Sequence, residues 1–327
     1  MNEDEIKDIQ NHLNERRVRL NKAIRRSDSV PELVELLHEV DSALERMHNG
    51  SYGTCEVCCE PIEKDRLIAD PLTTFCLEHL NNEQKKLLEQ DLDLASQIQN
   101  TLLPPNNLVA NGYEVNYHYL PAGPVSGDYC DLFLSKNDDK SLYFILGDIT
   151  GKGIAASMLV NHLYAIFHSL TELNLPLDEL MNRANRLFCE SSLYSHFATM
   201  VCGKASKDGA VELCNAGHCL PVLVTKDGAI SIDSTGLPLG LFHSAEYKTK
   251  IINFKPGDFL LIYSDGLSEA RREEEEFGVD RINKLAELSF QLSTSELIDL
   301  LIKNLNSFTR NSKRHDDLTI MAIKRLP

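Results

Sequence analysis

The stretch Ser141–Ser157, SLYFILGDITGKGIAAS, guides the interpretation of the rest of the chain. It begins with a short apolar and aromatic run, which is typical of a buried β-strand. The run stops at Gly147 and Asp148, and two further glycines lead into a helix-prone apolar segment. A carboxylate at the end of a buried strand, beside glycine-rich backbone, suits a hard metal ion or a reacting group. Taken alone, an aspartate that caps the next helix explains the pattern equally well.

Three other stretches favour a metal site. Val125–Asp131 carries two acids, Phe259–Gly266 repeats the order of strand, Asp and Gly, and Arg314–Ile320 places two acids ahead of a final apolar strand. Four acidic strand ends predict a single carboxylate cluster. Clustered carboxylates repel one another unless cations hold them, and oxygen ligands with open water positions select Mg²⁺ or Mn²⁺.

Length, composition and charge limit the class of protein. The chain has 327 residues, of which 43% are hydrophobic and 25% charged, and this length suffices for two or three domains. No apolar run approaches the ~20 residues of a membrane span, and the charged N-terminus lacks a signal-peptide core. We therefore expect a cytoplasmic protein with no membrane segment. A net charge of −16 argues against general binding to nucleic acid.

Cysteine spacing predicts a second, different metal site. Cys55 and Cys58 form one pair, and Cys76 and His79 form another after an intervening loop. The pattern C-x2-C…C-x2-H is a strong signal for a tetrahedral structural zinc ion. Four ligands close such a site, so it stabilises a small fold and does not catalyse. The adjacent Cys59 leaves open which thiol of that pair is the ligand.

Helical segments surround this cysteine cluster. Residues 2–49 carry leucines at helical spacing on both sides of a break at Ser27–Pro31, which predicts an antiparallel hairpin of two helices. Residues 80–103 form a charged helix in which Leu88, Ala95 and Leu102 recur at seven-residue steps. This helix is either a short coiled coil that joins two protomers in a homodimer or a helix packed on its own domain.

The segment Glu35–Leu80 resembles the DksA/TraR family of zinc-finger proteins. The resemblance rests on the helix that enters Gly50–Gly53, on the cysteine pairs and on the segment Arg66–Pro71 between them. That family usually has a fourth cysteine where this chain has His79, an exchange that zinc tolerates. In the family, the hairpin ahead of the finger enters the secondary channel of RNA polymerase and acts through acidic residues at its tip, where this chain holds Asp28. The resemblance therefore implies an alternative to catalysis, a non-catalytic transcription regulator that acts through the finger.

From Ile98 to the C-terminus the chain resembles bacterial PP2C-type serine/threonine phosphatases of the RsbU/SpoIIE group. Seven motifs carry the resemblance in order, namely Ile98–Pro104, Gly127–Asp131, Gly147–Gly153, Asn215–His218, Gly236–Gly240, Tyr263–Glu269 and Asp316–Thr319. The resemblance implies an α+β fold in which two β-sheets pack face to face, with helices outside and metals at one end.

The coarse pattern of the chain agrees with this fold class. Apolar runs separated by turn residues predict strands at 141–147, 197–205, 210–215, 220–225, 247–254, 259–263 and 318–324. Helical patterns at 153–173, 177–190, 279–290 and 294–308 supply outer layers. We therefore divide the chain into a helical hairpin with a zinc finger (1–80), a helical linker (81–105) and a phosphatase domain (106–327).

The resemblance to the phosphatases also assigns roles in the acidic cluster. Asp128, Asp148, Asp265 and Asp316 correspond to metal ligands, and Ile149 contributes its backbone carbonyl. Two Mn²⁺ or Mg²⁺ ions would activate a water that attacks phosphoserine or phosphothreonine, with no covalent enzyme intermediate. Substrates in this group are often phosphorylated anti-sigma-factor antagonists, so we expect a phosphoprotein partner of that class. The finger would be a sensor or a docking module for a regulator.

A few neighbouring residues are further candidates. Asp131 and Asp317 are candidates for residues that orient the metal ligands without binding the metal themselves. His218 lies in a Gly-His turn, and we expect it to fix a loop by hydrogen bonding. His315 flanks Asp316, and we expect it to be exposed. Ser126 stands where the family pattern has a glycine, which leaves the following ligand in place. We assign no general acid.

Overall fold

The computed structural model describes residues 3–25, 31–80, 82–135, 140–191, 196–310 and 314–327. The chain divides into two compact units, Met1–Asp93 and Leu94–Pro327. The sequence predicted three parts, namely a hairpin with a finger, a linker and a phosphatase domain. That division remains a prediction. None of the described helices combines the length and the apolar run that a membrane crossing requires.

The first unit contains a helical hairpin and a small finger. Helices α1 (Glu3–Ile24) and α2 (Pro31–His48) pack against each other through buried apolar residues at helical spacing, namely Ile9, Leu13, Leu20, Val40 and Ala43. The turn that joins them, including Asp28, lies outside the described residues. The finger contains α3 (Lys64–Ala69) and the short 3₁₀-helix η1 (Leu77–His79).

Helix α4 (Asn82–Leu102) has an exposed apolar side formed by residues that neighbour the predicted seven-residue steps. The exposed apolar residues are Leu87, Leu94 and Ile98, whereas the residues at the predicted seven-residue steps are only partly exposed. Whether α4 joins two protomers therefore stays a prediction.

The second unit contains two antiparallel sheets. One has the order β1-β2-β13-β10-β7-β8, with bounds Leu108–Ala110, Tyr113–Leu120, Leu318–Arg325, Phe259–Tyr263, Val222–Thr225 and Gly228–Ser231. The other has the order β3-β4-β5-β6-β9, with bounds Asp128–Leu134, Leu142–Ile149, Ala198–Ala205, Ala210–Ala216 and Lys250–Asn253. A separate short hairpin consists of β11 (Arg271–Arg272) and β12 (Glu275–Glu276).

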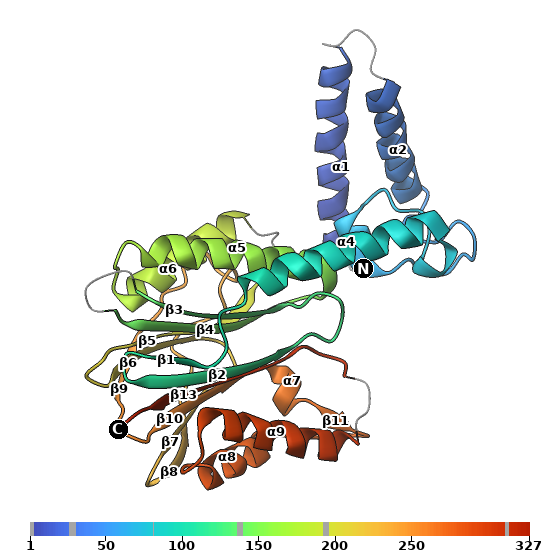
Figure 1. Cartoon of the computed structure of the whole chain (residues 1–327). Helices are drawn as coiled ribbons and strands as arrows, with labels where there is room; N and C mark the ends of the chain where they lie inside the picture. The colour runs from blue at the N-terminus through green and yellow to red at the C-terminus, as the bar shows by residue number, and fades with distance from the viewer. Residues whose placement is uncertain (1–2, 26–30, 81, 136–139, 192–195, 311–313) are drawn as a thin grey trace. The chain divides into compact units, whose positions relative to one another are not determined.

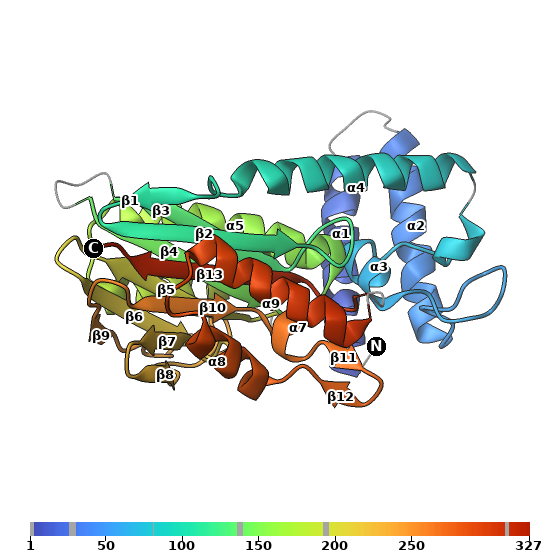
Figure 2. The same ribbon diagram turned by 60° about the horizontal axis from the view of Figure 1, so that its bottom comes forward.

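Helices cover the outer face of each sheet (Figures 1 and 2). Helices α5 (Gly153–Thr171) and α6 (Leu177–Ser191) pack on the sheet that contains β4. Helices α8 (Val279–Leu288) and α9 (Thr294–Thr309) pack on the sheet that contains β10. A third apolar core lies between the sheets. The predicted fold class, a two-sheet sandwich flanked by helices, is confirmed.

Side-chain alternation decides which residues face the space between the sheets. In β4, Leu142, Phe144 and Leu146 belong to the core between the sheets. Because alternate residues of a strand share a face, Asp148 is the last residue of β4 on that same face. Asp128 begins β3 directly opposite, since the two aspartates are paired in register. The inter-sheet core therefore ends in acidic side chains.

The sequence prediction missed β2 and β3 because both strands bury polar residues. Asn116 in β2 is buried and donates a 2.6 Å hydrogen bond to the hydroxyl of Thr294 on α9. Asp128 and Asp131 in β3 are also buried. These partners come from distant parts of the chain, so the polar residues look like loop residues in the sequence alone.

Candidate metal centres

The four aspartates of the predicted site gather at one end of the sandwich. Asp128 and Asp148 form a cross-strand pair of β3 and β4. In the other sheet, Asp265 follows the end of β10 and begins the short helix α7 (Asp265–Ser268), while Asp316 lies just before β13. The hydroxyl of Thr319 on β13 donates a hydrogen bond to the Asp128 carboxylate, which joins the two sheets at this end.

The carboxylates of this cluster destabilise one another when they are ionised. Burial raises the pKa of Asp128 well above its usual range, and the neighbouring Asp148 raises it further. Burial, followed by the charges of Asp265 and Asp316, raises the pKa of Asp148 to about 7. Burial and the Asp316 charge also raise the pKa of Asp265. An all-oxygen donor set with uncompensated negative charge suits hard divalent cations such as Mg²⁺ or Mn²⁺.

One lysine offsets part of this charge. The Nζ atom of Lys152 lies 3.0 Å from an Asp316 carboxylate oxygen and donates to the His315 carbonyl at 2.7 Å. Both side chains of the ion pair are about half exposed, so this pair is screened by water. Lys152 thus ties the glycine-rich turn after β4 to the loop before β13. The sequence analysis assigned Lys152 no role and missed this contact.

Asp317 holds the loop that precedes Asp128. Its carboxylate accepts hydrogen bonds from the backbone N–H groups of Ala122 at 2.7 Å and Gly127 at 2.8 Å. The backbone of Asp317 itself passes close to Gly266. A Cβ atom at position 266 would lie 1.9 Å from the Asp317 carbonyl oxygen, so this approach requires glycine. The contacts fit the supporting role predicted for Asp317, and that role remains a prediction.

Gln99 near the end of α4 is a further positioning residue. Its side-chain amide donates to the Ser126 carbonyl at 2.8 Å and accepts from the Ser126 N–H at 2.9 Å. The Ser126 hydroxyl in turn accepts from the Asp128 N–H at 3.0 Å. Both Gln99 and Ser126 are buried. The serine that replaces the family's glycine therefore accepts a hydrogen bond from the backbone of Asp128, and Gln99 joins α4 to the loop before that residue.

Asp131 does not join the cluster. It lies on the opposite face of β3, where its carboxylate accepts from the Tyr129 hydroxyl at 2.7 Å and lies 2.8 Å from His168 Nε2 on α5. Because three positions separate it from Asp128, strand alternation points the two side chains to opposite faces. The supporting role that the sequence suggested for Asp131 was therefore wrong.

The backbone of Ile149 lies beside the acidic motif. Its N–H donates to the Gly127 carbonyl at 3.2 Å, and its side chain is buried under the outer helices. A Cβ atom at Gly127 would approach the Ile149 carbonyl oxygen to 3.3 Å, so the glycine leaves room at that oxygen. Its role as a carbonyl ligand stays a prediction.

The two histidines have the settings that were expected. His218 is buried, and its Nδ1 lies 2.8 Å from the Thr199 hydroxyl. The side chain of Asn215 bonds both the N–H and the carbonyl of His218. Burial lowers the pKa of His218 to about 4, so the ring is neutral at neutral pH. His315 is exposed.

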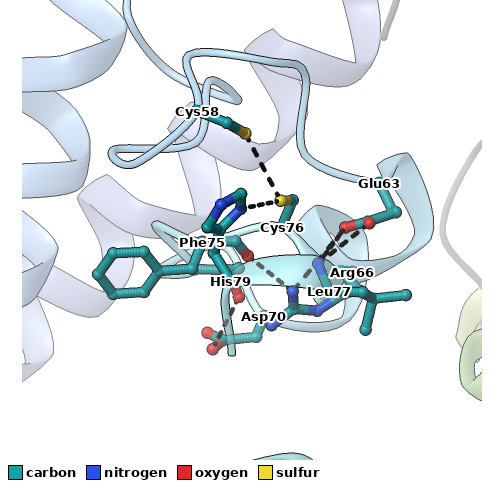
Figure 3. Close-up of polar contacts among 9 residues, drawn as sticks. Cys58, Glu63, Arg66, Asp70, Phe75, Cys76, Leu77 and His79 are labelled. Atoms are coloured by element: carbon teal, nitrogen blue, oxygen red, sulfur yellow. Dashed lines mark hydrogen bonds and ion pairs between the residues drawn. The ribbon is translucent and has the colours of Figure 1, made fainter. Parts of the chain in front are cut away.

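The cysteine cluster is a compact group of four residues, and Figure 3 shows three of them, Cys58, Cys76 and His79. One ligand atom from each of Cys55, Cys58, Cys76 and His79 lies within 4.8 Å of all the others. The Cys76 sulfur is 3.8 Å from the Cys58 sulfur and 3.1 Å from His79 Nδ1. These separations suit a tetrahedral ion with bonds of about 2.0–2.3 Å. Cys58 and not the exposed Cys59 belongs to the cluster, which settles the alternative left by the sequence.

The two clusters differ in size. Across the described ranges, no other group of three or more His, Cys, Asp or Glu residues has all its ligand atoms within 4.8 Å.

We predict that Cys76→Ser removes the bound metal of the finger and that Cys59→Ser leaves it in place. Loss of one ligand opens the tetrahedral site, and metal binding is coupled to the folding of such small units. Zinc content per purified chain and thermal unfolding of both variants measure the effect. Equal zinc content in the two variants would contradict this assignment.

We predict that the protein without Mg²⁺ or Mn²⁺ is more stable near pH 6 than near pH 8. The folded pKa of Asp148, about 7, lies above its usual value of 3.8, so the folded state binds more protons between these values. Stability is thus lost as the pH rises through 7. Asp148→Asn should raise stability near pH 8 by roughly 1–3 kcal/mol and abolish stabilisation by Mn²⁺. We would measure thermal unfolding of wild type, of Asp148→Asn and of Asp233→Asn, a control at an exposed site. Lower stability of Asp148→Asn than of wild type at pH 8 would refute the prediction.

Gln99→Ala should weaken the response of the protein to Mn²⁺ although it removes no ligand. The substitution leaves the buried N–H and carbonyl of Ser126 unpaired, at a cost of roughly 1–3 kcal/mol. Gln97→Ala, on the exposed side of the same helix, is the matched control. Mn²⁺ titrations followed by thermal unfolding give the comparison. Identical titrations for the two variants would show that Gln99 does not position the site.

Comparison with known proteins identifies the family. Residues 138–326 match the family described as Stage II sporulation protein E (SpoIIE), and residues 50–78 match the prokaryotic dksA/traR C4-type zinc finger. Protein IcfG of Synechocystis sp. is 25% identical over 287 residues, which are 76% of this chain and 45% of IcfG. Phosphoserine phosphatase RsbU of Bacillus subtilis is 24% identical over 241 residues, which are 73% of this chain and 71% of RsbU. The chain thus spans less than half of IcfG.

A solved structure agrees with the fold. The SiaA-PP2C domain of Pseudomonas aeruginosa superposes with a TM-score of 0.65 at 15% identity, covering 75% of this chain and 99% of that domain. This likeness shows the PP2C fold. The finger match ends one residue before His79, the ligand that departs from its four-cysteine pattern. Since the SpoIIE match alone covers more than half of the sequence, the chain belongs to the SpoIIE family of PP2C-type proteins and carries a dksA/traR-type zinc finger.

Proposed function

We propose that this protein is a metal-dependent protein serine/threonine phosphatase that hydrolyses phosphoserine or phosphothreonine on a regulatory protein. The observation that carries the proposal is the set of mutually repelling carboxylates at one end of the sandwich, in a chain of the SpoIIE family. Carboxylates in this arrangement need cations, and the donor set is that of Mg²⁺ and Mn²⁺ sites.

In this proposal Asp128, Asp148, Asp265 and Asp316, with the Ile149 carbonyl, hold two Mn²⁺ or Mg²⁺ ions. When bound, such ions lower the pKa of water and neutralise phosphoryl oxygens. The remaining residues position the ligands. Asp317 and Gln99 fix the loop before Asp128, and Thr319 fixes the Asp128 carboxylate from the opposite sheet.

The partner class is also part of the proposal. RsbU and RsbP of Bacillus subtilis, to which this chain is similar, are both described as phosphoserine phosphatases. A phosphorylated regulatory protein of the anti-sigma-factor antagonist type is therefore the substrate that we propose. A reducing compartment such as the cytoplasm suits a finger that ligates its ion through thiolates.

The finger contributes structure and not catalysis in this account. We propose that Cys55, Cys58, Cys76 and His79 hold one structural Zn²⁺ and that this unit docks or senses a regulator. Helix α4 would carry the signal, because its Gln99 contacts the loop before the first ligand. The alternative, a non-catalytic transcription regulator acting through the finger, assigns no role to the acidic cluster.

Phosphate release tests the proposal. With Mn²⁺, wild type should hydrolyse a phosphoserine peptide, and Asp148→Asn should be slower by about a hundredfold or more, since metal ions contribute several kcal/mol to such reactions. Asp233→Asn, which changes an exposed carboxylate, is the charge-matched control. Undiminished turnover by Asp148→Asn would refute the site. Absence of turnover in wild type with Mn²⁺ bound would favour the non-catalytic alternative.

A further inference from the structure

A cavity of about 370 Å³ opens beside the acidic cluster. Asp265 and Asp316 line one part of it, and Arg314, Glu269 and Leu305 line other parts, so that α7, α9 and the loop before β13 all contribute. The volume falls in the range of about 300–1,000 Å³ that is usual for ligand sites. Because Asp265 and Asp316 line it, the cavity adjoins the acidic cluster directly.

Two arginines, Arg271 and Arg314, line the cavity together with the carboxylates of Asp265, Glu269 and Asp316. Arg271 is already engaged, because its guanidinium lies 2.7 Å from the Glu276 carboxylate. Arg314 is partly buried and donates to the neutral side-chain oxygen of Asn306 at 3.3 Å. In the part of the chain that the structure describes, no carboxylate lies within 4.0 Å of the Arg314 guanidinium. Arg314 is therefore a cation anchored by an amide and open to an anion.

The part of the structure next to Arg271 is held in place by ion pairs and cation–π contacts. Arg272 and Arg281 both pair with Glu275, and both guanidinium groups lie over the Phe308 ring, at 4.8 Å and 4.7 Å from its centre. These contacts join the β11–β12 hairpin to α8 and α9. Side chains that are already held in place lose little conformational entropy when a ligand binds, which favours specific binding.

We propose that this cavity binds an acidic side chain of the substrate segment that flanks the phosphorylated residue, with Arg314 as its charged partner. The inference rests on the proposed phosphatase function, which places the phosphoryl group at the aspartate cluster. Successive residues of an extended peptide are about 3.3–3.6 Å apart, so a neighbouring side chain reaches past Asp265 and Asp316 into the cavity. The planar guanidinium presents paired N–H donors that match a carboxylate.

Two phosphoserine peptides of equal length test this inference, one with Asp and Glu beside the phosphoserine and one with Asn and Gln there. Wild type with Mn²⁺ should prefer the acidic peptide in kcat/KM, chiefly through a lower KM. Arg314→Gln should reduce that preference about tenfold, as expected for one charge-assisted hydrogen bond. Arg314→Glu should shift the preference toward the neutral peptide. Arg186→Gln, an exposed site on α6, is the matched control and should keep the wild-type preference.

The outcomes separate this inference from the function on which it rests. An unchanged preference in Arg314→Gln, or no preference in wild type, overturns it. An equal loss for both peptides also overturns it, because Arg314 would then contact the phosphoryl group and not the flanking carboxylate. Titration calorimetry with both peptides measures the same preference as a ratio of binding constants without turnover. Absent hydrolysis thus counts against the proposed function, and absent selectivity in binding counts against this inference.

Discussion

Repulsion among the carboxylates at one end of the sandwich is the constraint on which the site depends. The inter-sheet core of the sandwich is apolar along its length and then ends in Asp128 and Asp148, with Asp265 and Asp316 beside them. The raised pKa values of Asp128 and Asp148 express the free energy needed to ionise these carboxylates beside their acidic neighbours. Divalent cations would remove that penalty, which is why the proposed function places Mg²⁺ or Mn²⁺ at this cluster.

The surrounding structure holds these carboxylates from several directions. Both sheets supply carboxylates, and the hydrogen bond from Thr319 to Asp128 fixes one sheet against the other. Asp317 and Gln99 fix the loop before Asp128 through its backbone. Gln99 lies on α4, so the helix that follows the finger sequence reaches the site through two hydrogen bonds. A displacement of this helix end would leave buried polar groups of the loop unpaired, which gives a physical basis for regulation.

Much of the fold could be predicted from the sequence, but the contacts around the site could not. The apolar runs at β4, β10 and β13 mark strands whatever their neighbours are, because both of their faces are buried. Strand β3 was missed since the buried Asp128 and Asp131 each have a partner far along the chain, Thr319 and His168. For the same reason the role of Asp131 was misjudged, as its partner His168 lies on a helix 37 positions away. The choice of Cys58 over Cys59 likewise needed the backbone geometry.

The central claim is that the aspartates at the sandwich end bind divalent ions separately from the cysteine cluster. Crystals of the full chain soaked in Mn²⁺ test it through anomalous scattering at the manganese edge. The account predicts manganese peaks between Asp128, Asp148, Asp265 and Asp316, with zinc retained at Cys55, Cys58, Cys76 and His79. An acidic cluster without manganese, or manganese found only at the cysteine cluster, would contradict it.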